Sequence, residues 1–168
     1  MMDMLVPLYR LDGVAERVAG VRKQGITVRL AMAYERDAVI DWVRQVFEPE
    51  APGWAGECAV ALSSVPATCQ IATRDGALLG FACHDATAKG FFGPTGVDEQ
   101  VRGQGIGAAL LVASLAAMQG SGYAYAVIGG VREDLRSFYE KVVGAVEIAD
   151  SVPGIYRDRI VQRDSNRV

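Results

Sequence analysis

VDEQVRGQGIGAALLVASLAAM, residues 97–118, decides the fold, because a glycine-rich loop with one arginine leads there into a long apolar helix. The first N–H groups of a helix lack intrahelical partners, and its N-terminus carries about half a positive charge, so Asp or Glu usually lies there. This helix begins instead with Gly-Ile-Gly-Ala at 105–108, and Arg102 precedes it. The pattern predicts a binding site for an anion, and a phosphate-bearing ligand suits it best.

Two other glycine-rich motifs compete for this stretch. Gly103-x-Gly105-x-x-Ala108 fits the dinucleotide fingerprint in form, but that motif needs an acidic residue about 20 positions later. No Asp or Glu occurs between Glu99 and Glu133. A Walker-type loop needs Gly-Lys followed by Ser or Thr, which the chain lacks.

The spacing Arg102-x-x-Gly105-x-Gly107, after a short strand and before a long apolar helix, resembles the pyrophosphate-binding motif of the GNAT (Gcn5-related) N-acetyltransferases. A second match follows in Ser137-Phe138-Tyr139-Glu140-Lys141, which resembles the family's second signature. The chain departs from the family at Arg132, where Asn is frequent, at Leu135, where Ala is frequent, and at Gly144, which comes one residue late. The resemblance covers residues 26–161 and implies acetyl-coenzyme A as the ligand.

Composition limits the alternatives. The 168 residues suffice for one domain, and the chain is 51% hydrophobic and 22% charged, as in globular proteins. A net charge of −3 argues against a nucleic-acid or anionic-membrane partner. Asp3 and Pro7 interrupt any signal-peptide core, so we expect a cytoplasmic protein.

The three cysteines, Cys58, Cys69 and Cys83, have no metal-ligand spacing, and the chain contains a single histidine. The sequence therefore predicts reduced thiols and no metal.

Hydrophobic periodicity predicts the elements. We expect a strand broken by Pro7 and a helix within an N-terminal appendage, 1–25, that caps the sheet, contributes to a dimer or is simply a packed surface helix. The domain proper, 26–161, should contain a strand at 26–31, helices at 35–47 and 54–62, strands at 68–73, 77–82 and 91–97, the glycine-loop helix, a strand at 123–128, a helix at 132–143, and strands at 145–148 and 156–161. Residues 162–168 form a polar tail.

This order predicts an α/β fold with a mixed, mostly antiparallel sheet, helices on both faces and parallel strands before and after the glycine-loop helix. Pro94 removes one ladder N–H, so pairing in its strand must be interrupted. The resemblance implies a GNAT-like splay between the two parallel strands, which holds the thioester arm of coenzyme A.

Amide formation from a thioester needs a neutral amine, stabilisation of the oxyanion and a proton for the thiolate. Backbone N–H groups near Gly96 and Val97 could stabilise the oxyanion, and the resemblance implies that Tyr139 protonates the sulfur. His84 is the only side chain whose ordinary pKa lies near neutrality, so it is a candidate base. Asp98 and Glu99 are alternatives that would act through water, and each of these residues could equally be structural.

The remaining candidates fall into two groups. The residues expected to bind the cofactor are Gly96, Val97, Arg102, Gly103, Gln104, Gly105, Ile106, Gly107, Arg132 and Phe138. Those expected to contact the acceptor are Glu48, Trp54 and Asp85.

The sequence thus predicts an acetyl-coenzyme A-dependent transferase that acetylates a primary amine of a small molecule. Dimers are common in the resembling family, so a homodimer is also expected. The alternatives are a non-catalytic acyl-coenzyme A sensor or partner-binding domain, and transfer to a hydroxyl, a protein N-terminus or a lysine.

Overall fold

The computed structural model describes residues 1–48 and 50–160. Its centre is a seven-stranded sheet in the order β2-β3-β4-β5-β6-β1-β7. All neighbouring pairs are antiparallel except β5 and β6. The strands are β1 (Met2–Pro7), β2 (Thr27–Leu30), β3 (Cys69–Arg74), β4 (Ala77–His84), β5 (Phe91–Val97), β6 (Tyr125–Val131) and β7 (Val146–Ile148).

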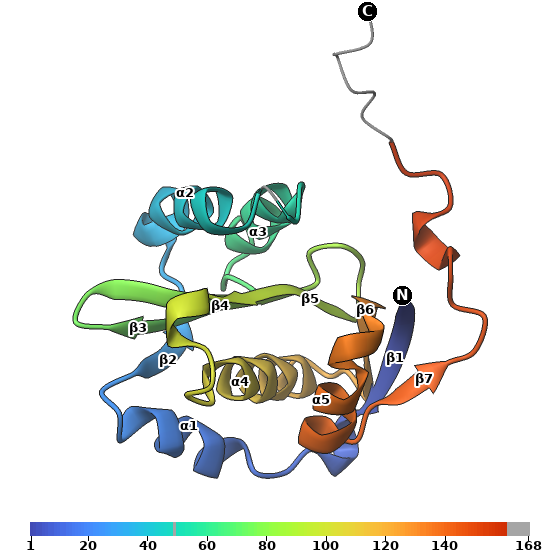
Figure 1. The fold of residues 1–168 in the computed structure, drawn as a ribbon, viewed down its shortest axis with the longest axis horizontal. Helices are drawn as coiled ribbons and strands as arrows, with labels where there is room; N and C mark the ends of the chain where they lie inside the picture. The colour runs from blue at the N-terminus through green and yellow to red at the C-terminus, as the bar shows by residue number, and fades with distance from the viewer. Residues whose placement is uncertain (49, 161–168) are drawn as a thin grey trace, which may run out of the picture.

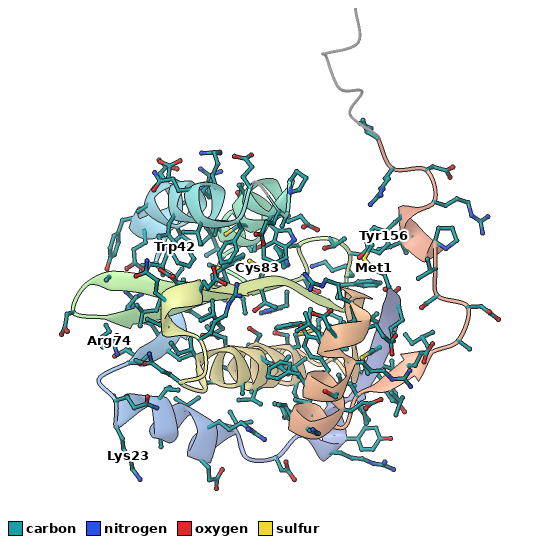
Figure 2. All side chains as sticks on the ribbon, viewed as in Figure 1. Met1, Lys23, Trp42, Arg74, Cys83 and Tyr156 are labelled. Carbon is teal, nitrogen blue, oxygen red and sulfur yellow. The ribbon has the colours of Figure 1, made fainter. Side chains whose placement is uncertain are left out.

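Helices cover both faces of the sheet, as predicted (Figure 1). Helices α2 (Arg36–Phe47) and α3 (Trp54–Leu62) lie over one face. Helices α1 (Val14–Arg22), α4 (Ile106–Gly120) and α5 (Glu133–Val143) lie on the other. Side chains fill the space between the sheet and the helices on both faces (Figure 2), and each face has its own hydrophobic core, one built on α4 and the other on α2 and α3.

Helix α4 occupies the centre of its core. Its buried residues lie on every side of the helix, because the sheet, α1 and α5 surround it. A helix that is apolar all round is stable only when it is enclosed in this way. The enclosure fixes α4 firmly and points its glycine-rich N-terminus at the end of β5.

The N-terminal strand is an internal strand of the sheet. Residues 1–25 were expected to form an appendage, but β1 pairs with β6 on one side and with β7 on the other. Its side chains Met4 and Val6 are fully buried in the α4 core. The N-terminus therefore completes the sheet beside the parallel pair.

The strand predicted at 156–161 is wrong over the described residues. A 3-10 turn, Gly154–Tyr156, is present, and residues 157–160 form no strand. β1 lies between β6 and β7 at this end of the sheet. Residue 161 and the predicted polar tail, 162–168, lie outside the described residues.

None of the helices in the described part of the chain combines the length and the apolarity that crossing a bilayer requires.

Candidate functional site

The N-terminus of α4 is open to a ligand. Gly105 precedes the helix with φ +82°, in the left-handed region that favours glycine. Among the described residues no side chain caps this end, and its first turn contains no acid. The N–H groups of residues 106–108 therefore point out of the helix without a negative side chain to neutralise them.

Arg102 lies beside this helix end. Its side chain is 57% exposed, and its Nη1 is 3.7 Å from Glu99 Oε1. Its Nε donates to the Val97 carbonyl at 3.3 Å. Because the ion pair is long and exposed, it holds the guanidinium weakly and leaves donors free for an anion.

Several predicted cofactor residues meet at the first turn of α4. A Cβ placed on Gly107 would lie 3.7 Å from Val97 Cγ2 and 4.0 Å from Phe138 Cζ. Ile106 is buried in the core below. Gly103, with φ +81°, is exposed, and Gln104 lies between it and the helix. The fold thus brings together residues from β5, the glycine loop and α5.

The parallel strands diverge as predicted. Within the part of the chain that the structure describes, two pairs, Phe91 with Val127 and Phe92 with Ile128, join β5 to β6. The register of β4 with β5 shifts between Ala82 and His84, opposite the segment that contains Pro94. Beyond this point, the open side of β5 faces the gap between the strands.

Backbone groups in this gap can be assigned from the ladder. Asp98 donates its N–H to the Leu79 carbonyl at 2.9 Å. Hydrogen-bonded positions alternate along an antiparallel strand, so the N–H of Val97 points away from β4 and toward β6. Val97 therefore offers a donor to the gap, whereas the N–H of Gly96 points to β4.

Gly96 has a different role, because its missing side chain makes room for Phe47. A Cβ on Gly96 would lie 2.5 Å from Phe47 Cζ. The Phe47 ring also packs against Trp54 and Phe81, at centroid distances of 5.4 and 5.8 Å. The α2/α3 side of the gap is therefore an aromatic wall, which includes the predicted acceptor residue Trp54.

Helix α1 packs against the glycine loop, which the sequence did not reveal. Gln24 donates its side-chain N–H to the Gln104 carbonyl at 3.2 Å. A hollow of about 250 Å³ lies between α1 and the start of α4, and Arg17 lines it together with Gly105. Arg17 thus adds a second guanidinium near the anion site.

Tyr139 lies on α5, facing the α4 core. It is 7% exposed, and its ring packs edge-on against Phe138 at 5.1 Å. Burial raises the pKa of Tyr139 to about 12. The phenol therefore stays protonated at neutral pH and can act only as a hydrogen-bond donor or an acid.

Arg132 is already engaged in an ion pair. It precedes α5, and Asp134 in the first turn binds it with two hydrogen bonds, of 3.0 and 2.7 Å. Glu133 adds a second acid to this turn. The N-terminus of α5 is therefore neutralised by its own side chains, unlike that of α4.

His84 is poorly placed for a base. It is 3% exposed, its Nδ1 has no hydrogen-bond partner among the described residues, and burial lowers its pKa. Its neighbour Cys83 packs under α3, so strand alternation turns His84 to the α4 side of the sheet. His84 is therefore a neutral residue on the face opposite the aromatic wall.

The carboxylate of Asp85 is hydrogen-bonded within the protein, at the loop that connects β4 with β5. Its carboxylate accepts hydrogen bonds from the Tyr123 hydroxyl at 3.0 Å and from the Gly90 N–H at 2.8 Å, and Lys89 lies 3.5 Å away. Burial and the Asp85 carboxylate raise the pKa of Tyr123. By contrast, Glu48 is exposed at the end of α2.

Tyr156 reaches the gap from the C-terminal segment. A Cβ on Gly129 would lie 2.6 Å from the Tyr156 hydroxyl and 3.0 Å from Phe91 Cδ1. Burial, with the charges of Asp3 and Glu57, raises the pKa of Tyr156. No local sequence pattern could have revealed this residue, because the strand predicted there would have placed it in the sheet.

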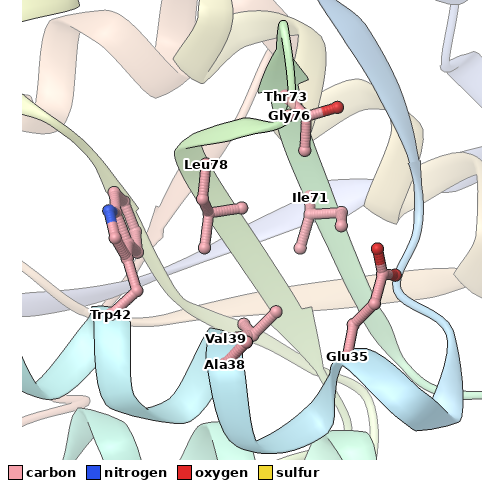
Figure 3. A pocket seen from close by; sticks show the side chains of 8 residues that line it. All are labelled: Glu35, Ala38, Val39, Trp42, Ile71, Thr73, Gly76 and Leu78. Atoms are coloured by element: carbon pink, nitrogen blue, oxygen red, sulfur yellow. The ribbon is translucent and has the colours of Figure 1, made fainter.

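A second hollow, of about 190 Å³, lies between α2 and the β3–β4 hairpin (Figure 3). Its one carboxylate, Glu35, accepts two hydrogen bonds from Arg29 at 2.7 and 2.6 Å. This pairing lowers the pKa of Glu35 to about 2. The carboxylate is thus satisfied by the protein and offers little to a ligand.

Comparison with known proteins agrees with this geometry. The model of the acetyltransferase (GNAT) family matches residues 36–145. No curated protein sequence matches the chain. Among solved structures, a GNAT acetyltransferase from Brucella melitensis in complex with acetyl-CoA is 25% identical, with a TM-score of 0.52, over 67% of this chain and 80% of that chain.

Two further structures share the fold at lower identity. A GCN5-related glucosamine N-acetyltransferase region of a fungal multi-domain GH3 β-N-acetylglucosaminidase has a TM-score of 0.70 at 15% identity, over 88% of this chain and 19% of that one. A GCN5-related N-acetyltransferase from Sphaerobacter thermophilus has a TM-score of 0.66 at 21% identity, over 88% of this chain and 48% of that chain. The chain thus spans about a fifth and about half of these two proteins. By the family model that matches most of its length, the chain belongs to the GNAT acetyltransferase family.

Proposed function

We propose that the protein transfers the acetyl group of acetyl-coenzyme A directly to a primary amine of a small molecule. The observation that carries this proposal is the α4 N-terminus, where uncapped N–H groups, an absence of acids in the first turn and Arg102 make a site for a diphosphate. The Brucella melitensis structure, which contains acetyl-CoA, supports the same ligand.

The reaction needs a neutral amine, stabilisation of the oxyanion and a proton for the thiolate, and the chain offers a residue for each of the last two. The Val97 N–H can donate to the carbonyl oxygen of the thioester as negative charge develops on it. The Tyr139 hydroxyl can donate to the departing sulfur. With its pKa raised to about 12, this phenol is a weaker acid than an ordinary thiol, so it stabilises a thiolate by hydrogen bonding more readily than by complete proton transfer.

The acceptor would lie on the α2/α3 side of the gap. Trp54 and Phe47 supply an aromatic surface there, and Glu48 and Glu57 supply negative charge around it. This combination suits an amine that is cationic in solution. Asp85 and Arg132 take no part, because their charged groups are paired within the protein. The homodimer and the cytoplasmic location remain predictions from the sequence.

One observation favours a second function. Of the bases suggested by the sequence, His84 is buried on the opposite face. The Asp98 carboxylate accepts the Gln100 N–H at 2.9 Å, and Glu99 lies 3.7 Å from Arg102. A domain that binds acyl-coenzyme A without catalysis would need no base. Thiol release in the presence of acetyl-coenzyme A and a panel of amines separates the two functions, since a sensor would show no release that depends on the amine.

The anion site is tested by the melting temperature with free coenzyme A. A ligand at 100 times its Kd stabilises a protein by about 2.7 kcal/mol, which for this length raises Tm by about 5–10 °C. Arg102→Glu should abolish that rise. Arg10→Glu, also on the surface but near the other end of α4, should retain it. An unchanged rise in Arg102→Glu would contradict the proposed site.

A further inference from the structure

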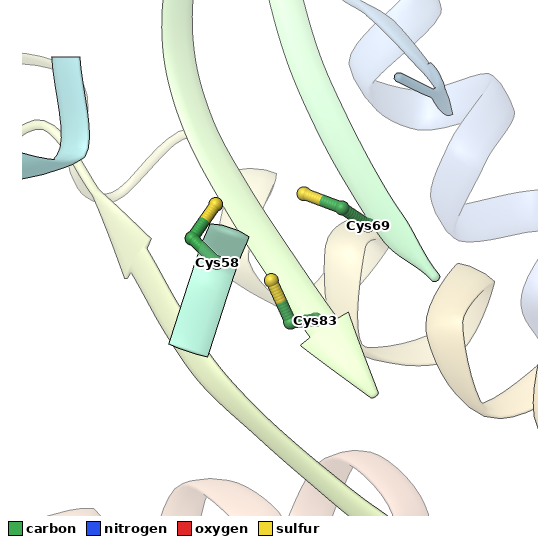
Figure 4. Close-up of side chains that lie close together, drawn as sticks. All are labelled: Cys58, Cys69 and Cys83. Atoms are coloured by element: carbon green, nitrogen blue, oxygen red, sulfur yellow. The ribbon is translucent and has the colours of Figure 1, made fainter. Parts of the chain in front are cut away.

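The three cysteines meet at one point of the α2/α3 core (Figure 4). Cys58 comes from α3, Cys69 from β3 and Cys83 from β4, and their sulfur atoms all lie within 4.8 Å of one another. All three side chains are fully buried. Segments up to 25 residues apart in the sequence thus present three thiols to a single position, which their spacing along the chain did not suggest.

The backbone holds this arrangement. Cys69 and Cys83 are directly opposite each other in the β3–β4 ladder, so their side chains point to the same face. Cys58 lies above them on the buried side of α3. Each sulfur is therefore fixed by a regular element.

The geometry fits a three-coordinate ion. Metal–thiolate bonds are about 2.3 Å long, so three of them at the pyramidal angles of about 100° that a trivalent ion with a lone pair adopts would separate the sulfurs by about 3.5 Å. Because the sulfurs already lie within 4.8 Å of one another, binding would only have to draw them closer together. No fourth His, Cys, Asp or Glu joins the cluster among the described residues, so the tetrahedral site that zinc prefers is incomplete.

Charge narrows the choice of ion. Three thiolates carry three negative charges, and an uncompensated charge is costly in an apolar core. A monovalent or divalent ion would leave a net negative charge, whereas a trivalent ion leaves none.

We propose that Cys58, Cys69 and Cys83 form a binding site for a trivalent, three-coordinate, thiophilic ion of the arsenic(III) and antimony(III) class. The reaction with arsenous acid is a ligand exchange without oxidation or reduction. Three S–H bonds and three As–O bonds break, three As–S bonds form, and the three protons leave with the three hydroxides as water.

This site is separate from the acetyl-coenzyme A site, but α3 connects the two. The bound ion would tie α3 to β3 and β4, and α3 begins at Trp54, which is part of the aromatic wall. Access to the buried thiols requires α3 to lift from the sheet. The ion should therefore enter slowly in the folded protein and quickly during refolding.

Native mass spectrometry of the reduced, full-length protein with arsenite tests the proposal. Arsenite is added both to folded protein and during refolding from denaturant, with a phosphine as the reductant so that no competing thiol is present. We expect one arsenic per chain at a mass gain of one arsenic less three hydrogens, protection of all three thiols from a thiol reagent, and a higher Tm. Zn²⁺ should raise Tm much less, because it lacks a fourth ligand.

Single variants locate the site. Cys58→Ala, Cys69→Ala and Cys83→Ala should each lose the three-hydrogen signature, because the chain contains no other cysteine. If a variant does not fold, the wild-type mass alone decides. Absence of arsenic after refolding, or a bound arsenic that retains a hydroxyl and displaces only two hydrogens, would overturn the three-thiol site. Binding of Zn²⁺ as tight as that of arsenite would overturn the argument from charge and coordination.

Discussion

Helix α4 follows β5 and helix α5 follows β6, and the N-termini of these two helices differ in whether their first turn contains acidic side chains. Helix α4 begins with glycine and has no acid in its first turn, whereas α5 begins after Arg132 and carries Glu133 and Asp134. In α5 the helix dipole and the nearby guanidinium are satisfied by side chains of the chain itself. In α4, no side chain of the described residues caps the N-terminus, and the first turn contains no acid.

This difference teaches how to interpret an arginine beside a helix start. Arg102 lies in the loop before α4, Arg132 directly precedes α5, and both were predicted to bind the cofactor. Only Arg102 has donors that the protein leaves largely unused, since its carboxylate partner is 3.7 Å away. Whether an arginine beside a helix N-terminus can bind an anion therefore depends on the acidic residues near it as well as on the arginine itself.

The largest expected effect comes from giving α4 an acid like those of α5. Gly107→Asp places a carboxylate in the first turn, where a Cβ fits at ordinary contact distance. It should abolish the rise of Tm with coenzyme A while leaving the Tm of the free protein equal or higher, because the acid favours the helix dipole. Gly107→Asn, a neutral variant of the same size, should keep most of the rise. Equal loss in both variants would mean that bulk, not charge, blocks the site.

The next effect concerns α5, whose proposed role is chemical. Tyr139→Phe should reduce kcat about 100-fold, the lower range for loss of a general acid, without changing the Kd for coenzyme A. Because the pKa of Tyr139 is raised to about 12, the wild-type rate should show no loss from its ionisation up to pH 10. Tyr123→Phe, at a tyrosine bound to Asp85, is the control. A Tyr139→Phe enzyme as fast as the wild type would exclude the hydroxyl from the reaction.

A smaller effect is expected at the first turn of α5. Asp134→Ala removes both hydrogen bonds to Arg132 and one acid from the helix N-terminus. The Tm of the free protein should fall slightly, and the rise with coenzyme A should be unchanged. If this variant bound coenzyme A much more tightly, Arg132 would be able to bind a phosphate once Asp134 is removed. The N-termini of α4 and α5 would then differ less than we propose.

The smallest effect lies away from both helix ends, at the pair formed by Arg29 and Glu35. Arg29 lowers the pKa of Glu35 from 4.5 to about 2, so the pair stabilises the fold above pH 4.5 and loses this contribution as the pH falls toward 2. Because the pair is partly exposed, Glu35→Gln should cost only about 0.5 kcal/mol at pH 7. The cost should vanish near pH 2 in urea unfolding, and a cost that persists there would point to packing rather than charge.

Local elements were predictable because their signals are local. The helical periodicity of α2 and α3, the successive strands predicted at 68–73 and 77–82, and the interrupted pairing near Pro94 depend on residues close in sequence, and the structure confirms them. The prediction of an anion site at the glycine loop likewise depends on one short motif. These features required no knowledge of how distant segments pair.

The features that sequence missed depend on distant contacts. The sequence did not show that β1, residues 2–7, lies beside β6 in the sheet. Packing, and not the order of the strands along the chain, decides which strand pairs with β6. The hollow with Arg17, the covering of Gly129 by Tyr156 and the meeting of the three cysteines have the same origin. The burial of His84 likewise depends on contacts between distant segments.

The central claim is tested most directly by amide chemical shifts during titration with coenzyme A. The account predicts large shifts for the backbone N–H groups of Ile106, Gly107 and Ala108, at the start of α4, and small ones for Glu133, Asp134 and Leu135, at the start of α5. Equal shifts at both helix ends, or none at residues 106–108, would contradict it.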